Sequence, residues 1–355
     1  MATIWIDLDN SPHVPLFAPI IHHFRETGVD VILTAREHSQ TIELLDLHGF
    51  RGTYAMLGRH YGKGRLNKIS GLMIRSKQLV SHINKDRKPI SVAVSHGSRS
   101  MVLAARWLKV PVLTMYDYEF NETHIFNRFS DRVLVPDGIP ASVLDEMGLA
   151  PSKKSTYHGF KEEVYVSRFT PDPEFRKSFL LQHGHHDGPE NVLLTLRPPA
   201  STANYHSTKS DTLFDDVLQL LMNAQHVITV IVPRTRQQTA EISERVARLR
   251  SEGRRSIVLE GAVKGLDLLY ASDLVISGGG TMNREAALLD VPVYSTFAGR
   301  QGALDRKMEQ DGRMVFIRDA RDLSKIRFER RSSSSITPLT DQVETSVIAE
   351  IERFL

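Results

Sequence analysis

The segment with the clearest chemical content runs Gly278, Gly279, Gly280, Thr281, between an apolar run and a helical pattern. Glycine lets a backbone approach a ligand closely and adopt positive φ. A helix that begins directly after such a turn offers unpaired N–H groups and the positive end of its dipole to a phosphate. We expect Thr281 to cap this helix or to donate its hydroxyl to a phosphate oxygen, and Glu285 to accept from ribose hydroxyls. The alternative is a simple tight turn in which the glutamate complements the dipole.

Four residues of the first half are candidates for proton transfer. His13 follows the first apolar run at the start of a helical pattern, and an imidazole pKa of about 6.5 suits proton transfer near neutrality. The alternative is that it caps the helix or binds a phosphate. Asp117, Glu119 and Glu122 cluster after a later apolar run, where a carboxylate would deprotonate an acceptor hydroxyl or protonate a leaving oxygen. The alternative is an ordinary acidic loop.

Arg197 ends another apolar run, within Arg-Pro-Pro-Ala. A guanidinium there would neutralise a departing diphosphate without a metal ion. Equally, it would pair with a carboxylate and hold two domains together. The histidine-rich sequence at 183–188 reads as a surface loop, so no metal site is predicted.

Positive charge is concentrated in residues 59–88, which contain nine Lys or Arg and one acid, a net charge of +8. Because the whole chain carries +3, the remainder carries −5. Such a segment attracts a diphosphate-linked acceptor or an anionic membrane surface, and it is otherwise a solvated helical face. Nucleic acid is not expected, because stacking aromatics and a recognised binding motif are missing. The residues predicted to bind the anion are Arg59, Lys63, Arg65 and Lys68.

The composition is that of a globular protein, with 355 residues of which 41% are hydrophobic and 25% charged. This length is comfortable for two domains. The absence of cysteine excludes disulfides, thiolate metal sites and a cysteine nucleophile, and it fits a reducing cytoplasm. We expect no signal peptide and no membrane-spanning segment, since no apolar run approaches about 18 residues.

Short β-branched runs alternate with amphipathic stretches along the chain, which is typical of doubly wound parallel sheets. The predicted strands are Thr3–Asp7, Val29–Thr34, Ile90–Ser95, Val110–Met115, Arg132–Val135, Asn191–Leu196, Val227–Val232, Ser256–Leu259, Asp273–Ser277 and Val291–Ser295. The predicted helices are Pro15–Thr27, Ser39–His48, Ser98–Leu108, Asp211–Asn223, Thr239–Ser251, Leu266–Tyr270, Thr281–Leu289 and Thr337–Leu355. A stretch rich in Pro, Gly, Ser and Lys, residues 136–173, contains no long periodic element and should hold the domain boundary.

These patterns predict an α/β protein of two Rossmann-like domains, residues 1–165 on the acceptor side and 166–355 on the donor side. The last helix is expected to cross back to the first domain. Ligands of such sheets bind beyond the carboxyl ends of the strands, where the candidate residues above are placed.

The donor-side segment resembles the donor-binding segment of GT-B glycosyltransferases. The resemblance lies in the glycine loop, Glu-Ala-Ala at 285–287 and Val-Pro-Val at 291–293. The enzyme that adds N-acetylglucosamine to the lipid-linked peptidoglycan precursor is similar, as are the UDP-N-acetylglucosamine 2-epimerases. The resemblance implies a GT-B-like fold with a central cleft, a nucleotide-sugar substrate that is UDP-linked, and a sugar contact from Gln301. It implies no cofactor.

The whole chain resembles an uncharacterised GT-B-like family with a Pro-His-Val element, here 12–14, and a Gly-Phe-Lys-Glu-Glu linker, here 159–163. The function expected from all this is metal-independent glycosyl transfer in the synthesis of cell-surface polysaccharide or glycoconjugate. A UDP-sugar 2-epimerase is the alternative, although similar epimerases carry Asp where this chain has Ser98. A non-catalytic nucleotide-sugar-binding protein is the third. We expect a cytoplasmic protein whose acceptor is lipid-linked or anionic, with peripheral contact at the inner face of the membrane.

Overall fold

The computed structural model describes residues 2–37, 40–59, 64–86, 88–199, 208–250, 255–332 and 335–355. Residue contacts divide the chain into two compact units. Unit 1 comprises Met1–Ser167, Gly302–Leu304 and Thr340–Leu355, and unit 2 comprises Arg168–Gln301 and Asp305–Leu339. The division between the units falls after Ser167, and the last helix belongs to unit 1.

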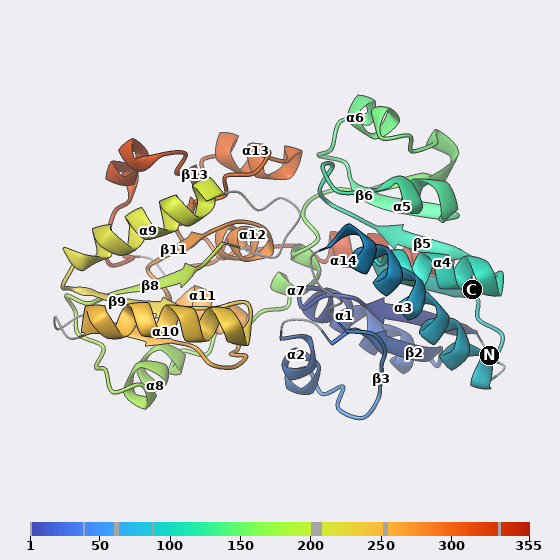
Figure 1. The fold of residues 1–355 in the computed structure, drawn as a ribbon, viewed down its shortest axis with the longest axis horizontal. Helices are drawn as coiled ribbons and strands as arrows, with labels where there is room; N and C mark the ends of the chain where they lie inside the picture. Colours follow the sequence, from blue (N-terminus) through green and yellow to red (C-terminus); the bar gives the residue numbers. More distant parts are fainter. Residues whose placement is uncertain are drawn as a thin grey trace. The chain divides into compact units, whose positions relative to one another are not determined.

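Unit 1 is built on a parallel sheet of seven strands in the order β3-β2-β1-β4-β5-β6-β7 (Figure 1). The strands are β1 Thr3–Leu8, β2 Asp30–Ala35, β3 Ala55–Met56, β4 Val92–His96, β5 Val112–Met115, β6 Arg132–Pro136 and β7 Lys154–Tyr157. The chain winds outward in one direction from β1 and in the other from β4. The switch point between these two strands is where doubly wound sheets bind ligands.

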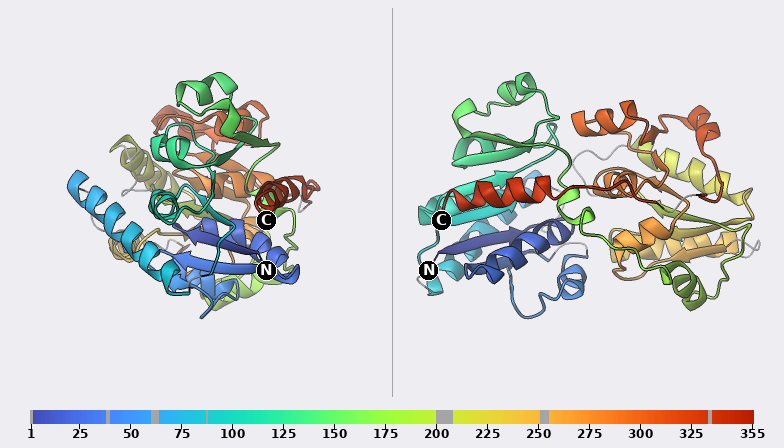
Figure 2. Two further views of the ribbon diagram at one scale, coloured as in Figure 1. Left: turned by 90° about the vertical axis from the view of Figure 1, so that its right-hand side faces the viewer. Right: turned by 180° about the vertical axis from the view of Figure 1, so that it is seen from behind.

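The helices of unit 1 form two groups, which cover the sheet as expected for a doubly wound fold (Figure 2). Helices α3 Arg65–Asp86, α4 Arg99–Leu108 and α5 His124–Phe129 pack in sequence against one another. Helices α1 His13–Glu26, α2 Thr41–Leu47, α7 Glu163–Val166 and α14 Gln342–Glu352 pack together as the second group. Two further short elements are α6 Ala141–Glu146 and the 3-10 turn η1 Pro151–Lys153.

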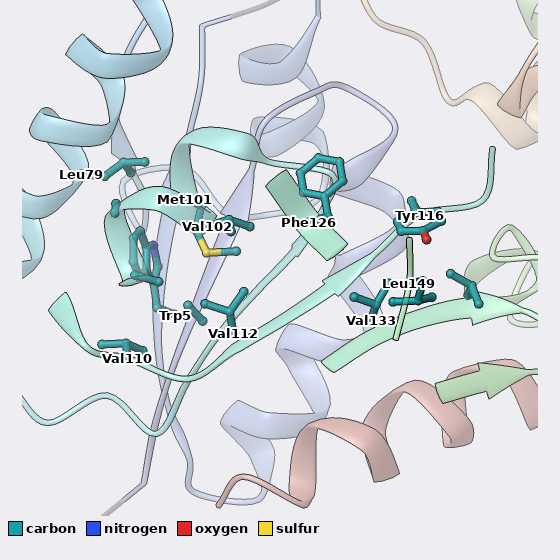
Figure 3. Packing of buried hydrophobic residues seen from close by; sticks show 14 of the residues in the cluster. Trp5, Leu79, Met101, Val102, Val110, Val112, Tyr116, Phe126, Val133 and Leu149 are labelled. Atoms are coloured by element: carbon teal, nitrogen blue, oxygen red, sulfur yellow. The ribbon is translucent and has the colours of Figure 1, made fainter. Parts of the chain in front are cut away.

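The core under α3 and α4 is centred on Trp5, which is fully buried (Figure 3). Met101 and Val102 of α4 and Leu79 of α3 pack in the same cluster. The indole Nε1 donates a hydrogen bond to Thr34 Oγ1 at 2.9 Å, so the one polar atom of this side chain is satisfied.

Unit 2 repeats the design with six parallel strands in the order β10-β9-β8-β11-β12-β13. The strands are β8 Val192–Arg197, β9 Val227–Ile231, β10 Arg255–Val258, β11 Leu274–Ser277, β12 Val293–Ser295 and β13 Val315–Phe316. The helices are α8 Phe175–Gln182, α9 Thr208–Met222, α10 Arg236–Arg250, α11 Gly265–Ala271 and α12 Thr281–Leu288, with the 3-10 turn η2 Ala320–Lys325. Helix α13 Ala303–Gln310 begins with two residues assigned to unit 1 and continues in unit 2 from Asp305. The switch point here lies between β8 and β11.

Successive residues of β8 enter different cores, which shows that helices cover both faces of this sheet. Val192, Leu194 and Leu196 pack with α9 and α10, whereas Leu193 packs with α8 and α11. Alternate side chains of a strand point to opposite faces, so a continuous apolar run is what a doubly covered strand requires.

The structure contains elements that the sequence analysis did not predict, namely strands β3, β7 and β13 and helices α3, α5, α6, α7, α8 and α13. β7 was not predicted, because only Tyr157 of its four residues is buried and the strand has no apolar run. The long helix α3 was not assigned, because its charges obscure the apolar period. The closing helix begins at Gln342 rather than Thr337, and Pro338 disfavours a helical conformation for the residue before it. Within the described part of the chain, no helix is both long and apolar enough to cross a bilayer.

Candidate functional site

The switch point of unit 1 brings two histidines together. His13 is the first residue of α1, after β1, and His96 is the last residue of β4. Because β1 and β4 are neighbours in the sheet, the two rings meet with centroids 5.2 Å apart and planes at 53°. His13 is 7% exposed. The position of His13 at the start of the first helix agrees with the sequence pattern, whereas its pairing with His96 was not predicted.

The environment of His13 favours a neutral imidazole. Burial holds its pKa well below 6.5, and positive charge at His96 and Lys161 lowers it further, while Asp117 acts in the opposite direction. Its Nδ1 has no hydrogen-bond partner among the described residues. His13 is therefore a neutral imidazole at neutral pH with a ring nitrogen that makes no hydrogen bond to the described residues, as a general base requires.

Asp117 lies directly beside these histidines and is held from two sides. Its Oδ1 is 3.3 Å from His96 Nε2, and its Oδ2 accepts a hydrogen bond from Lys161 Nζ at 2.5 Å. Lys161 also donates to Glu162 Oε1 at 2.6 Å. Lys161 is 3% exposed and Glu162 is fully buried. A lysine so deep is stable as an ammonium only when carboxylates surround it, and here there are two.

The other two predicted carboxylates do not join this cluster. Glu119 is buried, and its Oε1 accepts a hydrogen bond from the backbone N–H of Ala303, which belongs to the same unit. Glu122 is exposed and forms an ion pair with Arg99 at the start of α4. The loop after β5 turns these carboxylates toward different neighbours, and the role of at least one of them in proton transfer stays a prediction.

A second buried network lies beneath the same switch point. Arg75 of α3, 1% exposed, binds both carboxylate oxygens of Asp7, at 2.7 and 2.9 Å. Its Nη1 also lies 3.0 Å from Asp9 Oδ1. Burial raises the pKa of Asp9, while Arg75 opposes the shift. Ser98 Oγ donates to Asp7 Oδ2 at 2.5 Å, which ties the end of β4 to β1.

This network corrects the view of residues 59–88 as a uniformly solvated basic face. Arg75 belongs to that segment but points into the core, and Lys88 donates to Asp30 at 2.7 Å. Of the four residues predicted to bind an anion, Arg59 and Lys68 are exposed. Lys63 and the side chain of Arg65 lie outside the described residues, so the structure does not test a four-residue anion site.

The switch point of unit 2 contains the glycine loop. Gly278 N–H donates to the carbonyl oxygen of Arg197, the last residue of β8, at 3.1 Å. A Cβ on Gly278 would lie 2.7 Å from the backbone Cα of Pro199, so no larger residue fits. Gly279 and Gly280 have φ of +111° and +80°, which L-residues rarely adopt. The loop therefore needs glycine at all three positions.

Helix α12 begins immediately after this loop without a side-chain cap. Gly280 occupies the N-cap position, so the expectation that Thr281 caps the helix is wrong; Thr281 is its first residue and is half-buried. Glu285 is half-buried on the next turn. Asn283 is 1% exposed, and its Oδ1 has no hydrogen-bond partner among the described residues. First-turn N–H groups without a cap form an anion-binding end.

Several polar side chains of unit 2 on and near α13 form hydrogen bonds and ion pairs with one another. Gln301 Nε2 donates to Glu309 Oε2 at 2.8 Å, and Arg318 binds both oxygens of the same glutamate. Asp305 forms a buried pair with Arg284 of α12 at 2.9 Å. The amide of Gln301, predicted to contact a sugar, is thus engaged within the protein.

Sequence reasoning missed His96, Lys161, Glu162 and Arg75 as members of buried clusters. One clue was available for Asp7, a carboxylate inside an otherwise apolar strand, since a buried charge requires a partner. A second was Lys161 within the Gly-Phe-Lys-Glu-Glu element. Neither clue identifies the partner. Across the described residues, no group of three or more His, Asp or Glu side chains is arranged to hold a metal ion.

Solved structures of similar fold cover the whole chain. The UDP-GlcNAc 2-epimerase of Methanocaldococcus jannaschii, solved with UDP-GlcNAc and UDP, is 15% identical with a TM-score of 0.71, over 99% of this chain and 100% of that one. An MnaA–UDP co-structure from S. aureus is 14% identical with a TM-score of 0.75, over 100% and 97% of the two chains. They confirm the predicted GT-B-like fold class of two Rossmann-like parallel-sheet domains.

Comparison of sequences identifies the family. The uncharacterized protein MJ0665 of Methanocaldococcus jannaschii is 26% identical over 325 residues, which cover 90% of this chain and 89% of that protein. The family model described as "Protein of unknown function (DUF354)" matches residues 2–344. The chain therefore belongs to the DUF354 family, as the Pro-His-Val, Gly-Phe-Lys-Glu-Glu and Gly-Gly-Gly-Thr elements had indicated.

Proposed function

We propose that the protein is a glycosyltransferase that takes its sugar from a nucleotide diphosphate bound at Gly278–Thr281. The uncapped start of α12, after a loop that only glycine can form, carries the proposal. Such a helix end binds phosphate, and Arg197 in the adjoining strand supplies a guanidinium that matches two phosphate oxygens. Two structures of similar fold are named for complexes with UDP, which supports uridine as the base.

Two further residues of unit 2 are proposed to hold the rest of the donor. Glu285 lies one turn after Thr281, within reach of ribose hydroxyls once the diphosphate is at the helix end. Gln301 would contact the sugar, which requires its amide to exchange Glu309 for a sugar hydroxyl. The assignment of Glu285 rests on its position after the loop, and that of Gln301 rests on the resemblance to GT-B glycosyltransferases.

The proposed chemical step uses His13 as the general base. The acceptor hydroxyl oxygen forms a bond to C1 of the sugar, while the bond from C1 to the diphosphate oxygen breaks and its electron pair leaves with the nucleotide. The hydroxyl proton passes to the ring of the neutral His13. Arg197 and the α12 dipole stabilise the negative charge on the leaving diphosphate, so the step as written uses no metal ion.

Asp117 and Lys161 are proposed to act through the histidines. Asp117 Oδ1 lies next to His96 Nε2, and Lys161 donates a hydrogen bond to the other oxygen of the same carboxylate. That negative charge is the counter-charge for the imidazolium that His13 becomes after accepting the proton. The acceptor is proposed to be lipid-linked or anionic, because of the excess positive charge in residues 59–88.

The environment of Ser98 favours transfer over epimerisation. Epimerases similar to this chain carry a carboxylate at this position. Ser98 is fully buried, caps α4 by accepting a hydrogen bond from Met101 N–H, and donates to Asp7 Oδ2 at 2.5 Å. A carboxylate here would lie against Asp7, so this position supplies no acid or base. Epimerisation remains the second candidate, because several of the similar structures are UDP-GlcNAc 2-epimerases that match this chain over nearly their full length.

The test uses purified full-length protein and separates the functions by product. Thermal shift against UDP-, GDP-, dTDP- and CMP-sugars identifies the donor, since a ligand of the native state must raise Tm. The donor is then incubated alone and with polyprenyl-diphosphate-linked sugars. Nucleotide release that depends on the acceptor supports transfer. A 2-epimer formed without acceptor indicates the epimerase, and a Tm shift without turnover indicates a binding protein. No shift with any donor would refute the proposal.

A further inference from the structure

An apolar row is exposed along the first half of α3. Leu66, Ile69 and Met73 are 82%, 52% and 45% exposed, and Ile74 beside them is 43% exposed. Residues spaced by three and four positions share one face of a helix. Single exposed apolar side chains are ordinary, but a row of them on one helix face indicates a surface that a partner covers.

The apolar row faces solvent because the opposite side of α3 is packed against the core of unit 1. Arg75 is tied to Asp7, and Leu79 is fully buried in the core. The start of α3 stands clear of the neighbouring helices of unit 1 (Figure 2), and residues 66–70 are all exposed. The apolar row therefore faces away from the core because the other face of α3 is fixed to it.

Positive charge accompanies the row. Lys77, also exposed, continues it by four positions after Met73. The surrounding segment 59–88 carries +8 in sequence. Apolar side chains with adjacent lysines are the pattern of helices that lie in an anionic membrane interface.

We propose that the apolar row of α3 docks on an anionic lipid bilayer, with Leu66, Ile69 and Met73 entering the headgroup boundary and Lys77 binding lipid phosphate. A second copy of the chain is a poorer occupant, because it would bring two copies of the same predominantly basic segment against each other. Docking is independent of nucleotide-sugar chemistry, so it stands or falls separately from the proposed function.

The experiment is co-sedimentation of the full-length protein with vesicles of phosphatidylcholine alone and of phosphatidylcholine mixed with phosphatidylglycerol. We expect binding to the mixed vesicles, weakened by salt because the attraction is screened. Leu66→Ser, Ile69→Ser and Met73→Ser combined should reduce partitioning at least about tenfold, since each removes an exposed apolar side chain that the bilayer would bury. Lys77→Ser should reduce it about fivefold. Leu181→Ser is the control, as that residue is 61% exposed on α8 and should bind like wild type.

Three results would overturn the proposal. They are no binding to the mixed vesicles, unchanged binding of the triple variant, and a dimer in size exclusion that the triple variant dissociates. The single variants Leu66→Ser and Met73→Ser repeat the measurement, so that an unfolded triple variant does not decide it. The UDP-induced shift of Tm is measured on the same samples; docking with no UDP shift leaves this proposal intact and refutes the donor site instead.

Discussion

Arg75 of α3 and Asp7 of β1 are 68 positions apart in sequence and form a two-pronged ion pair in the core of unit 1. Both side chains are almost wholly excluded from solvent. Breaking a buried pair by removing one partner leaves an uncompensated charge. This pair fixes α3 to the carboxyl end of β1, beside the strand end that leads to His13.

The first prediction concerns that pair. Arg75→Met should lower the free energy of unfolding by about 3–5 kcal/mol, measured by chemical denaturation. Arg75→Met with Asp7→Asn should cost less than the sum of the two single changes, because no charge is then left unpaired. Lys77→Met on the same helix is the control, with a change within about 0.5 kcal/mol. Equal effects of Arg75→Met and Lys77→Met would contradict the buried pair.

The second prediction is a pH dependence that comes from His13. Because burial lowers its pKa below 6.5, the unfolded chain binds a proton below that pH and the native state does not. The free energy of unfolding should therefore fall as pH drops through 6.5, by about 1 kcal/mol per pH unit from this group. His13→Gln removes this effect. Over the whole interval from pH 7.5 to 5.5, the variant should therefore lose about 1.4 kcal/mol less free energy of unfolding than wild type does.

The control for this measurement is His186→Gln, because His186 is exposed. Its stability should follow pH as the wild type does. If His13→Gln has the wild-type pH profile as well, His13 is not buried in its neutral form, and its proposed role as a base loses its support.

The third prediction concerns the buried lysine. Lys161→Met leaves Asp117 and Glu162 without their shared cation, so unfolding should become easier by about 3–5 kcal/mol. Adding Glu162→Gln should restore part of the loss, since one buried charge is then removed. Lys177→Met, at an exposed position of α8, should be nearly neutral. A Lys161→Met protein as stable as Lys177→Met would show that the ammonium is not required in this cluster.

The fourth prediction tests the glycine loop. Gly278→Ala places a Cβ against the backbone of Pro199, so the loop must shift and the UDP-induced rise in Tm should disappear. Gly261→Ala is the matched control, because nothing lies within 4 Å of its Cβ position; it should keep the full rise. If Gly278→Ala also keeps it, the nucleotide does not bind at this loop.

The alternation of apolar strands and amphipathic helices determined the fold class from sequence alone. The strands at β1, β2, β8 and β9 are nearly all apolar because helices cover both faces of each sheet. Such a run of apolar residues can be recognised in the sequence of each strand by itself. The glycine loop was equally visible, since its backbone conformation and its tight approach to Pro199 exclude other residues. β7 was not predicted, because a strand with only one buried side chain has no apolar run in its sequence.

Only the tertiary structure decided which residues meet. His13, His96 and Lys161 come from three separate parts of the chain, and their meeting depends on β1 lying beside β4 in the sheet. The sequence likewise could not show whether the side chain of Arg75 faces the core or the solvent, because a basic residue on a helix is buried only where a carboxylate can pair with it. The periodicity of apolar residues shows which face of an element is buried, and the glycines show where the backbone turns tightly. The partners of buried charges depend on strand order, which brings together residues that are distant in the chain.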